Sequence, residues 1–140
     1  MSVRGKPSPV SVLRAQTRGD GLVLGFGVDG ARAVAVGGQG RDLFLWSDDG
    51  ETFSAKKSPG PGLRSAFLQG DELWVVGEYG YVAFSSDRGE TWARRESGTR
   101  GCLFGIAPDS SGNWWLGGDG GFLAVSTDGV SLTKLSGIRE

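Results

Sequence analysis

The sequence contains no histidine, and cysteine and methionine occur only once each among its 140 residues. A single cysteine, Cys102, excludes an intramolecular disulfide. The absence of histidine excludes the Ser–His and Cys–His pairs that commonly activate catalytic nucleophiles. The residues that follow Cys102 include Leu103, Phe104 and Ile106, which is typical of a core strand rather than of a reactive thiol. The chain therefore lacks the commonest means of nucleophilic catalysis.

The sequence also has almost no net charge and no long apolar run. Its 15 Lys and Arg residues against 16 Asp and Glu give a formal charge of −1, which provides no basic field for nucleic acid and no polybasic patch for a membrane. Residues 1–9 are polar and contain two prolines, without the apolar segment of a signal peptide. No run is long enough to span a bilayer. We therefore expect a cytoplasmic protein with no nucleic-acid or membrane partner and no cofactor.

What the sequence does contain is glycine, 26 residues of it, in a repeated pattern. The segment VGGQG at residues 36–40 recurs as VGEYG at 76–80 and as LGGDG at 116–120, a spacing of 40 residues. A fixed period of this length is typical of repeat folds, in which one supersecondary unit stacks on copies of itself. Because the glycines follow no collagen triplet, they indicate many tight turns.

Each repeat has the pattern of four short strands, with apolar and β-branched runs separated by Gly and Asp and with no helical spacing. In the second repeat the predicted strands are residues 63–69, 72–78, 81–86 and 91–96. A 40-residue unit of four antiparallel strands is one blade of a β-propeller, so the sequence predicts an all-β propeller with three blades per chain. The predicted divisions are an N-terminal arm with an extra outermost strand at residues 1–20 and blades at 21–60, 61–100 and 101–140.

A polar turn follows the third predicted strand of every repeat and carries a family resemblance. In the second repeat, the segment SSDRGETW fits the pattern S-x-D-x-G-x-T-W at every specified position. The residues in those positions are Ser85, Asp87, Gly89, Thr91 and Trp92. The first and third repeats carry shorter versions, with Ser47, Asp49, Gly50 and Phe53, and with Ser126, Asp128 and Gly129. This pattern resembles the Asp-box, or BNR, repeat of sialidase-type propellers and of many non-enzymatic ones.

Together with the glycine segments, the boxes over residues 21–137 most resemble the propellers of the photosystem II stability and assembly factor family. The resemblance implies that the boxes lie at the blade periphery, away from the binding face. The residue types fit a structural role, because an Asp carboxylate can accept backbone N–H groups of its own loop and Gly can take a positive φ. The aromatic residue can pack beneath the hairpin as an anchor. We therefore expect the box residues to stabilise turns rather than to bind calcium or substrate.

Two further patterns bear on metal binding and catalysis. Residues 37–45 match the calcium-binding nonapeptide G-G-x-G-x-D-x-U-x, but that motif binds metal in tandem copies and occurs once here, so we interpret it as a hairpin turn. A sialidase resemblance implies an arginine triad, a Tyr/Glu pair and an acidic Asp from a whole ring. The candidates Arg64, Glu78 and Tyr79 form no such pair by spacing. We therefore expect a non-enzyme, with these three as possible binding residues on the ring face.

Three blades are too few to close a propeller ring. Two copies related by a two-fold axis would form a six-bladed ring, which predicts a homodimer. The alternative is that these residues are part of a longer propeller. Two segments, residues 10–16 and residues 131–135, compete for the outermost position of the third blade. The first is longer, richer in β-forming residues and aligned with the outer strand of the second blade. If it completes the third blade of a partner chain, the subunits exchange strands.

The functional hypothesis is a non-catalytic scaffold that binds an unidentified protein or peptide through its ring face and assembles as a homodimer. It depends on the family resemblance and on the lack of catalytic residues. The alternative is a glycan-binding or vestigial sialidase-like module, suggested by the Asp-boxes and the five Trp residues. Most of these Trp residues fall on predicted strands or in box positions, where core packing explains them.

Overall fold

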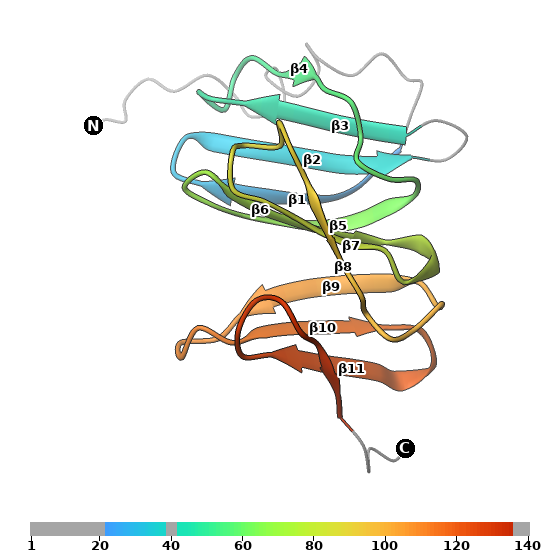
Figure 1. Ribbon diagram of the computed structural model, residues 1–140. Coiled ribbons are helices and arrows are strands. Elements are labelled where there is room, and N and C mark those ends of the chain that lie inside the picture. Colours follow the sequence, from blue (N-terminus) through green and yellow to red (C-terminus); the bar gives the residue numbers. More distant parts are fainter. Residues whose placement is uncertain (1–21, 39–41, 136–140) are drawn as a thin grey trace.

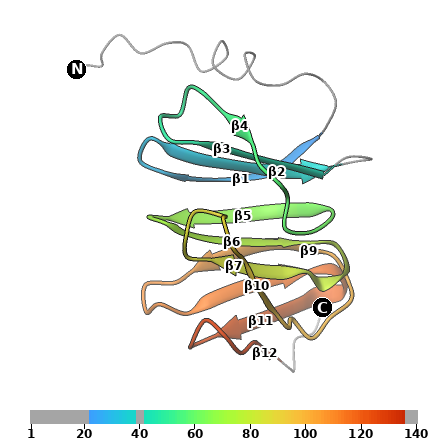
Figure 2. The same ribbon diagram turned by 45° about the horizontal axis from the view of Figure 1, so that its top comes forward.

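The computed structural model describes residues 22–38 and 42–135, which form three antiparallel sheets of four strands each (Figures 1 and 2). The first sheet contains β1 (Val23–Asp29), β2 (Arg32–Gly38), β3 (Asp42–Ser47) and β4 (Ser54–Ala55). The second contains β5 (Leu63–Gln69), β6 (Glu72–Gly77), β7 (Val82–Ser85) and β8 (Ala93–Arg95). The third contains β9 (Leu103–Pro108), β10 (Trp114–Gly118), β11 (Phe122–Ser126) and β12 (Thr133–Lys134).

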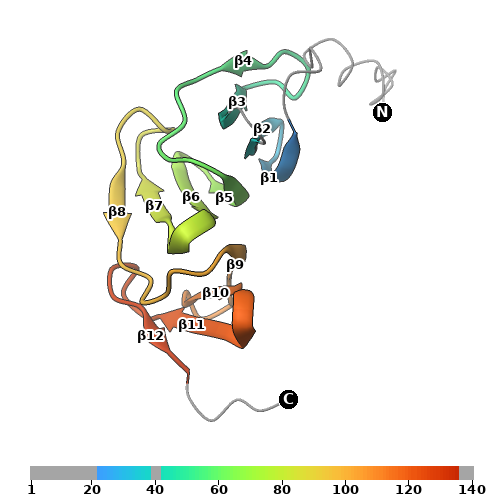
Figure 3. The same ribbon diagram turned by 90° about the vertical axis from the view of Figure 1, so that its right-hand side faces the viewer.

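Each sheet is one blade, with its strands side by side in chain order. Viewed along the strands, the blades follow one another along an arc, with β1, β5 and β9 on the inner side and β4, β8 and β12 on the outer side (Figure 3). This arrangement confirms the predicted all-β fold of four-stranded propeller blades. In the second blade, β5 has the predicted bounds and the other three strands lie inside the predicted ranges.

Single-turn 3-10 helices, η1 (Glu78–Gly80) and η2 (Asp119–Gly121), follow β6 and β10. Each has a left-handed central residue, Tyr79 with φ of 59° and Gly120 with φ of 70°. Across the described ranges, no helix has the length and apolarity needed to cross a membrane.

Successive side chains of a strand point to opposite faces of its sheet. The apolar side chains on these faces pack against the next blade, so the hydrophobic core lies between the blades. The junction of the first and second blades buries Val34, Val36, Phe44, Trp46, Leu63, Ala66, Leu68, Leu73, Val75 and Ala83. The junction of the second and third blades buries Trp74, Val76, Val82, Leu103, Ile106, Leu116, Phe122 and Ala124. Among residues 22–38 and 42–135, the second blade is therefore packed on both faces, whereas the first and third blades are each packed on one.

In the third blade, the glycine that closely approaches the inner strand lies one residue later than the 40-residue spacing predicts. In the first two blades, the glycine near the end of the second strand, Gly37 or Gly77, is so close to the residue before the inner strand that a Cβ would overlap its carbonyl oxygen. In the third blade this position is held by Gly118. A Cβ on Gly117, the predicted counterpart, would have no atom nearer than 3.8 Å. The alignment of the third repeat on Gly117 is therefore wrong by one residue.

The cause of this shift is the loop between β9 and β10. In the second blade, residues 70–71 connect the inner strand to the second strand, whereas residues 109–113 make this connection in the third. Asp109 closes the longer loop, because its carboxylate accepts the backbone N–H groups of Ser111 at 2.8 Å and of Asn113 at 3.0 Å. The longer connection displaces the positions from Gly118 to Ser126 by one residue, and the shorter third box restores the 40-residue spacing at Gly129.

The outermost position of the third blade is occupied by β12, which pairs with β11 through Ala124 with Lys134 and Val125 with Thr133. Of the two competing segments, residues 131–135 therefore hold this position in the described part of the chain, and the pairing of residues 10–16 with a partner chain stays a prediction. Residues 10–16 lie outside the described residues, as do residues 39–41 of the nonapeptide segment. The strands on either side of that segment, β2 and β3, pair antiparallel.

Candidate functional site

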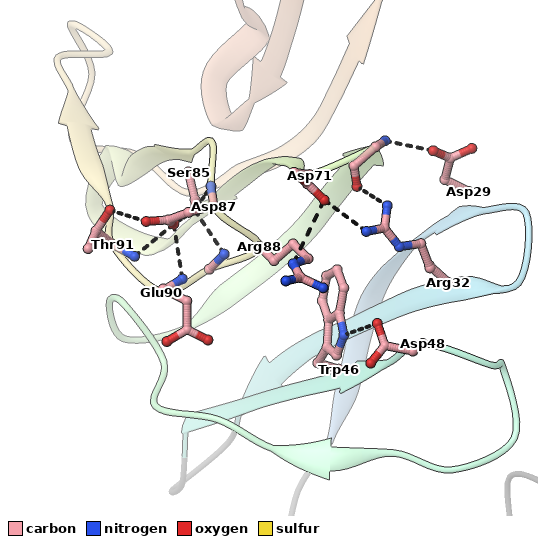
Figure 4. A network of polar contacts seen from close by, with 12 residues as sticks. Asp29, Arg32, Trp46, Asp48, Asp71, Ser85, Asp87, Arg88, Glu90 and Thr91 are labelled. Carbon is pink, nitrogen blue, oxygen red and sulfur yellow. Dashed lines mark hydrogen bonds and ion pairs between the residues drawn. The ribbon is translucent and has the colours of Figure 1, made fainter.

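The Asp-box of the second blade forms a turn held by its own side chains (Figure 4). The Asp87 carboxylate accepts the backbone N–H groups of Glu90 at 3.1 Å and Thr91 at 2.9 Å, and the Thr91 hydroxyl at 2.6 Å. The buried Ser85 hydroxyl donates to the same carboxylate at 2.7 Å and accepts the N–H of Gly89 at 2.8 Å. Gly89 has φ of 83°, a conformation that favours glycine. The polar side chains of the motif therefore form their hydrogen bonds within the turn itself.

The shorter boxes of the first and third blades form the same kind of turn. Asp49 and Asp128 each accept two backbone N–H groups at 2.8 Å, from the residues two and three positions later. Ser47 and Ser126 each donate to that carboxylate and accept the N–H of the turn glycine. These glycines have positive φ, 76° at Gly50 and 74° at Gly129.

The apolar residue at the end of the second and third boxes lies between blades, where the sequence predicted an anchor beneath the box's own hairpin. Trp92 of the second blade meets Phe44 of the first blade edge to face, with 5.7 Å between ring centroids and 68° between the planes. Leu132 of the third blade packs on the core of the second junction. Phe53 has the same position in the first blade and is half-buried. The second and third boxes therefore connect neighbouring blades.

Two basic side chains on the outer edge make a repeated connection to the next blade. Lys56 Nζ donates to a backbone carbonyl of the second box at 3.1 Å, and Arg95 Nε donates to the carbonyl of Gly129 in the third box at 2.9 Å. Each cation also lies over the aromatic residue that precedes the box serine of its own blade. Lys56 is 5.4 Å from the ring of Trp46, and Arg95 is 5.5 Å from the ring of Phe84.

Polar contacts also join the first two blades at their inner hairpins (Figure 4). Arg32 of β2 donates to the carbonyl of Gly70 at 2.7 Å and to the carboxylate of Asp71 at 2.8 Å. The carboxylate of Asp29 accepts the backbone N–H of Gly70 at 2.7 Å. The relative position of these blades is therefore held by directional bonds as well as by apolar packing.

The box carboxylates have lowered pKa values, because hydrogen bonds stabilise their charged form. The hydroxyl and backbone N–H of Thr91 hold the pKa of Asp87 well below its usual value of 3.8. Backbone N–H groups, chiefly the one three residues later, lower the pKa of Asp49 and of Asp128. In the β9–β10 loop, the indole N–H of Trp115, 2.9 Å from the carboxylate, is the main group that lowers the pKa of Asp109 to about 2.

The protein is therefore expected to lose thermal stability in acid, between about pH 5 and about pH 2. A carboxylate whose pKa is lower in the folded chain stabilises the fold above its ordinary pKa of 3.8. That stabilisation is lost as the pH falls through the folded-state pKa, which is about 2 for Asp109. Melting temperatures should fall below about pH 5, and less steeply in an Asp87→Asn variant. A melting temperature that stays constant over this range would contradict the assigned hydrogen bonds.

The three inner strands each contain a β-bulge at the same end of the blade. The pairing of each inner strand with its second strand shifts register at the second residue of the inner strand. This leaves Leu24, Arg64 and Phe104, which we call the inner-rim residues, outside the regular ladder. Bulges redirect side chains and are common next to binding sites. Their spacing of 40 residues could have identified Leu24 and Phe104 from the sequence, but the residue types differ too much to form a motif.

The structure brings together two of the three predicted ring-face residues. The Arg64 guanidinium and the Glu78 carboxylate form an ion pair at 2.6 Å, which spacing along the chain did not predict. Tyr79 follows in η1, and its side chain is 73% exposed. The η1 turn lies against β9, so Tyr79 and Phe104 belong to the same end of neighbouring blades. This end of the blades is the candidate binding surface.

The described residues form a groove whose lining lacks the side chains of a catalytic centre. This groove of about 440 Å³ lies on the outer edge between the first two blades and is lined by Lys56, Lys57, Ser58, Pro59, Gly89, Glu90 and Trp92. Its single carboxylate, Glu90, is paired with Lys56 at 2.9 Å, so the groove has neither two acids nor a nucleophile with a base. Within residues 22–38 and 42–135, no group of three His, Cys, Asp or Glu side chains could hold a metal ion.

Comparison with known proteins bears on the fold. No family model and no curated protein matches the sequence. Among solved structures, YCF48 bound to D1 peptide is similar, with a TM-score of 0.62 and 16% identity over 80% of this chain and 38% of that chain. YCF48 from Cyanidioschyzon merolae is similar with a TM-score of 0.58 and 18% identity, over 78% of this chain and 39% of that chain.

This chain therefore spans less than half the length of these structural neighbours. YCF48 is a photosystem II assembly factor with a β-propeller fold, so the resemblance predicted from the boxes and the glycine segments is confirmed at the level of the fold. The chain is an all-β partial propeller, similar in fold to the photosystem II assembly factor YCF48.

Proposed function

We propose that this protein is a non-catalytic propeller scaffold that binds a protein or peptide at its inner rim. The observation that carries the proposal is the repeated bulge at Leu24, Arg64 and Phe104, at the same blade end as the exposed Tyr79. A neighbour in fold, YCF48, is known bound to a D1 peptide, which supports peptide binding by a propeller of this type.

The chemistry of this surface suits recognition. Phe104 is 55% exposed and Tyr79 is 73% exposed, and exposed aromatic side chains are the commonest anchors of protein interfaces. The charge of Arg64 is compensated by Glu78, so the surface has no isolated cation at this point. We therefore expect a peptide that contributes apolar side chains to the aromatic pair and polar groups to the Arg64–Glu78 pair.

The test uses peptides selected from a random display library on the immobilised protein. Tyr79→Gly should weaken their binding about tenfold or more, the loss typical of an aromatic hot spot. Its melting temperature should not fall, because glycine relieves the positive φ of 59° at this position. The control is Val130→Ala, at an exposed residue of the third box at the opposite blade end. Equal dissociation constants for the wild type and Tyr79→Gly, measured by calorimetry, would contradict the proposal.

The alternative, a glycan-binding module, has one supporting observation. Trp115 is 36% exposed on β10, and its indole N–H donates to Asp109, which holds the ring in one orientation. A glycan array separates the two functions. Glycan binding that is lost in Trp115→Ala and kept in Tyr79→Gly would favour this alternative over peptide binding.

We propose further that a second copy of the chain completes the ring as a homodimer. In the described part of the chain, the first and third blades each have one sheet face without a neighbouring blade (Figure 3). Six blades from two copies would cover both faces with closed two-fold symmetry. Light scattering at micromolar concentration should give twice the chain mass of 14.7 kDa. A single folded chain mass would contradict the homodimer and favour further blades of a longer propeller.

A further inference from the structure

We call the sheet face of the first blade that points away from the second blade, and the face of the third blade that points away from the second, the open faces. The open face of the first blade carries large apolar side chains on its inner strand. Gly25 and Gly27 of β1 point toward the second blade, since a Cβ on Gly27 would lie 3.0 Å from the backbone nitrogen of Leu68. Alternate residues of a strand point to opposite faces. Phe26 and Val28 therefore point away from the second blade, and they are 68% and 60% exposed.

On the open face of the third blade, the large side chain lies on the second strand and the small residues lie on the inner strand. Leu116 of β10 is buried against the second blade, so Trp115 points to the open face. Trp115 pairs with Ala107 of β9 and with Val125 of β11, which places the three side by side. The inner strand β9 is small on this face, and a Cβ on Gly105 would meet no atom within 4 Å.

The buried junction of the first two blades shows how such faces meet. The inner strand β1 packs directly on β5, and this close approach uses Gly25 and Gly27 against the β5 backbone. By strand register, the positions of Gly25 and Gly27 correspond to Gly105 and Ala107 in the third blade. On the face that a following blade would cover, the inner strand of the third blade therefore has only small residues, as the inner strand of the first blade does.

The two open faces are complementary when they are placed in the same relation as the buried junction. On the inner strands, the large side chains of Phe26 and Val28 in the first blade would face the small residues Gly105 and Ala107 of β9. On the second strands, the first blade has the small Ala33 and Ala35, which pair with Val28 and Phe26. The large Trp115 of the third blade meets these two alanines. Large residues thus lie opposite small ones at both strands, as close packing requires.

We propose that the open face of the first blade packs on the open face of the third blade of a second copy, with Phe26 against Ala107 and Trp115 against Ala33 and Ala35. This seam rests on the proposed homodimer and specifies how its subunits meet. The contact is head to tail, so a two-fold axis generates two identical seams. A second copy is the occupant because each face carries the size pattern that fits the other face of the same chain.

The first test places a charge in the seam. Phe26→Asp should raise the dissociation constant of the dimer about 100-fold or more, since an unpaired carboxylate would be buried among apolar side chains. Sedimentation over a dilution series measures this constant. The control, Val130→Asp, adds the same charge at a residue that is 56% exposed in the third box, and the dimer should be unchanged. Circular dichroism should show the same strand content in both variants.

The second test detects the seam directly. Chains carrying Phe26→Cys and chains carrying Ala107→Cys, both with Cys102→Ser and with different tags, are mixed and oxidised with diamide. A disulfide-linked species with both tags is expected, and none is expected when Val130→Cys replaces Ala107→Cys. A monomeric wild type overturns the homodimer and the seam together. A dimeric wild type that tolerates Phe26→Asp and gives no crosslink overturns the seam and leaves the homodimer.

Discussion

Replacing Trp74 with alanine is expected to destabilise the protein by about 3 to 5 kcal/mol, the range for removing a buried aromatic side chain. Trp74 is 3% exposed, and its ring centroid lies 4.9 Å from those of both Phe84 and Trp114. Arg95 lies 6.0 Å from the same ring. Small domains have about 5 to 15 kcal/mol of stability in total. The variant should therefore unfold at a much lower urea concentration than the wild type.

Trp74→Phe is the matched control for this prediction. It keeps an aromatic ring at the junction of the second and third blades and removes the indole N–H, which has no hydrogen-bond partner among the described residues. We expect a smaller loss than for Trp74→Ala, because the variant keeps most of the buried aromatic surface and leaves a smaller cavity. If Trp74→Ala unfolds at the same urea concentration as the wild type, the packing between these two blades is wrong.

Gly118→Ala is expected to destabilise the protein by about 3 kcal/mol, the upper part of the range for overpacking, and Gly117→Ala by less than about 1 kcal/mol. A Cβ on Gly118 would overlap the carbonyl oxygen of Cys102, whereas a Cβ on Gly117 would lie 3.8 Å from the nearest atom, the carbonyl oxygen of Phe122. The Cys102 carbonyl is held in place by the backbone N–H of Asp119 at 2.9 Å. Relief of the overlap would therefore break a hydrogen bond.

Denaturation midpoints of the two glycine variants also test the register of the third repeat. The 40-residue spacing assigns the close backbone approach to Gly117, and the structure assigns it to Gly118. The adjacent positions make each variant the control for the other. A larger loss in Gly117→Ala than in Gly118→Ala would support the sequence alignment and contradict the structure of the β9–β10 loop.

The second blade was predictable almost residue by residue. Its strands are short alternating or apolar runs, and the turns between them carry Gly and Asp, so the signals are local. The first box and the third box were recognisable for the same reason, since their contacts join residues two or three positions apart. The structural role of Asp49, Asp87 and Asp128 depends on these short-range bonds.

The candidate binding surface was only partly predictable. Arg64, Glu78 and Tyr79 stood out by residue type, but their chain spacing carries no information on the ion pair between Arg64 and Glu78. The inner-rim residues Leu24 and Phe104 become visible only through strand register, because a bulge is a property of two paired strands. A repeat with a different side chain in every copy leaves no motif in the sequence.

By itself the sequence determined the repeating unit, the four strands of each blade and the turns that join them, because these depend on interactions between residues close together in the chain. Only the tertiary structure decided the register of Gly118, the packing of Trp92 on Phe44 and the choice of β12 as the outer strand of the third blade. These contacts join separate strands or blades. Their geometry depends on loop length and on the distance between sheets, which no local pattern of residues specifies.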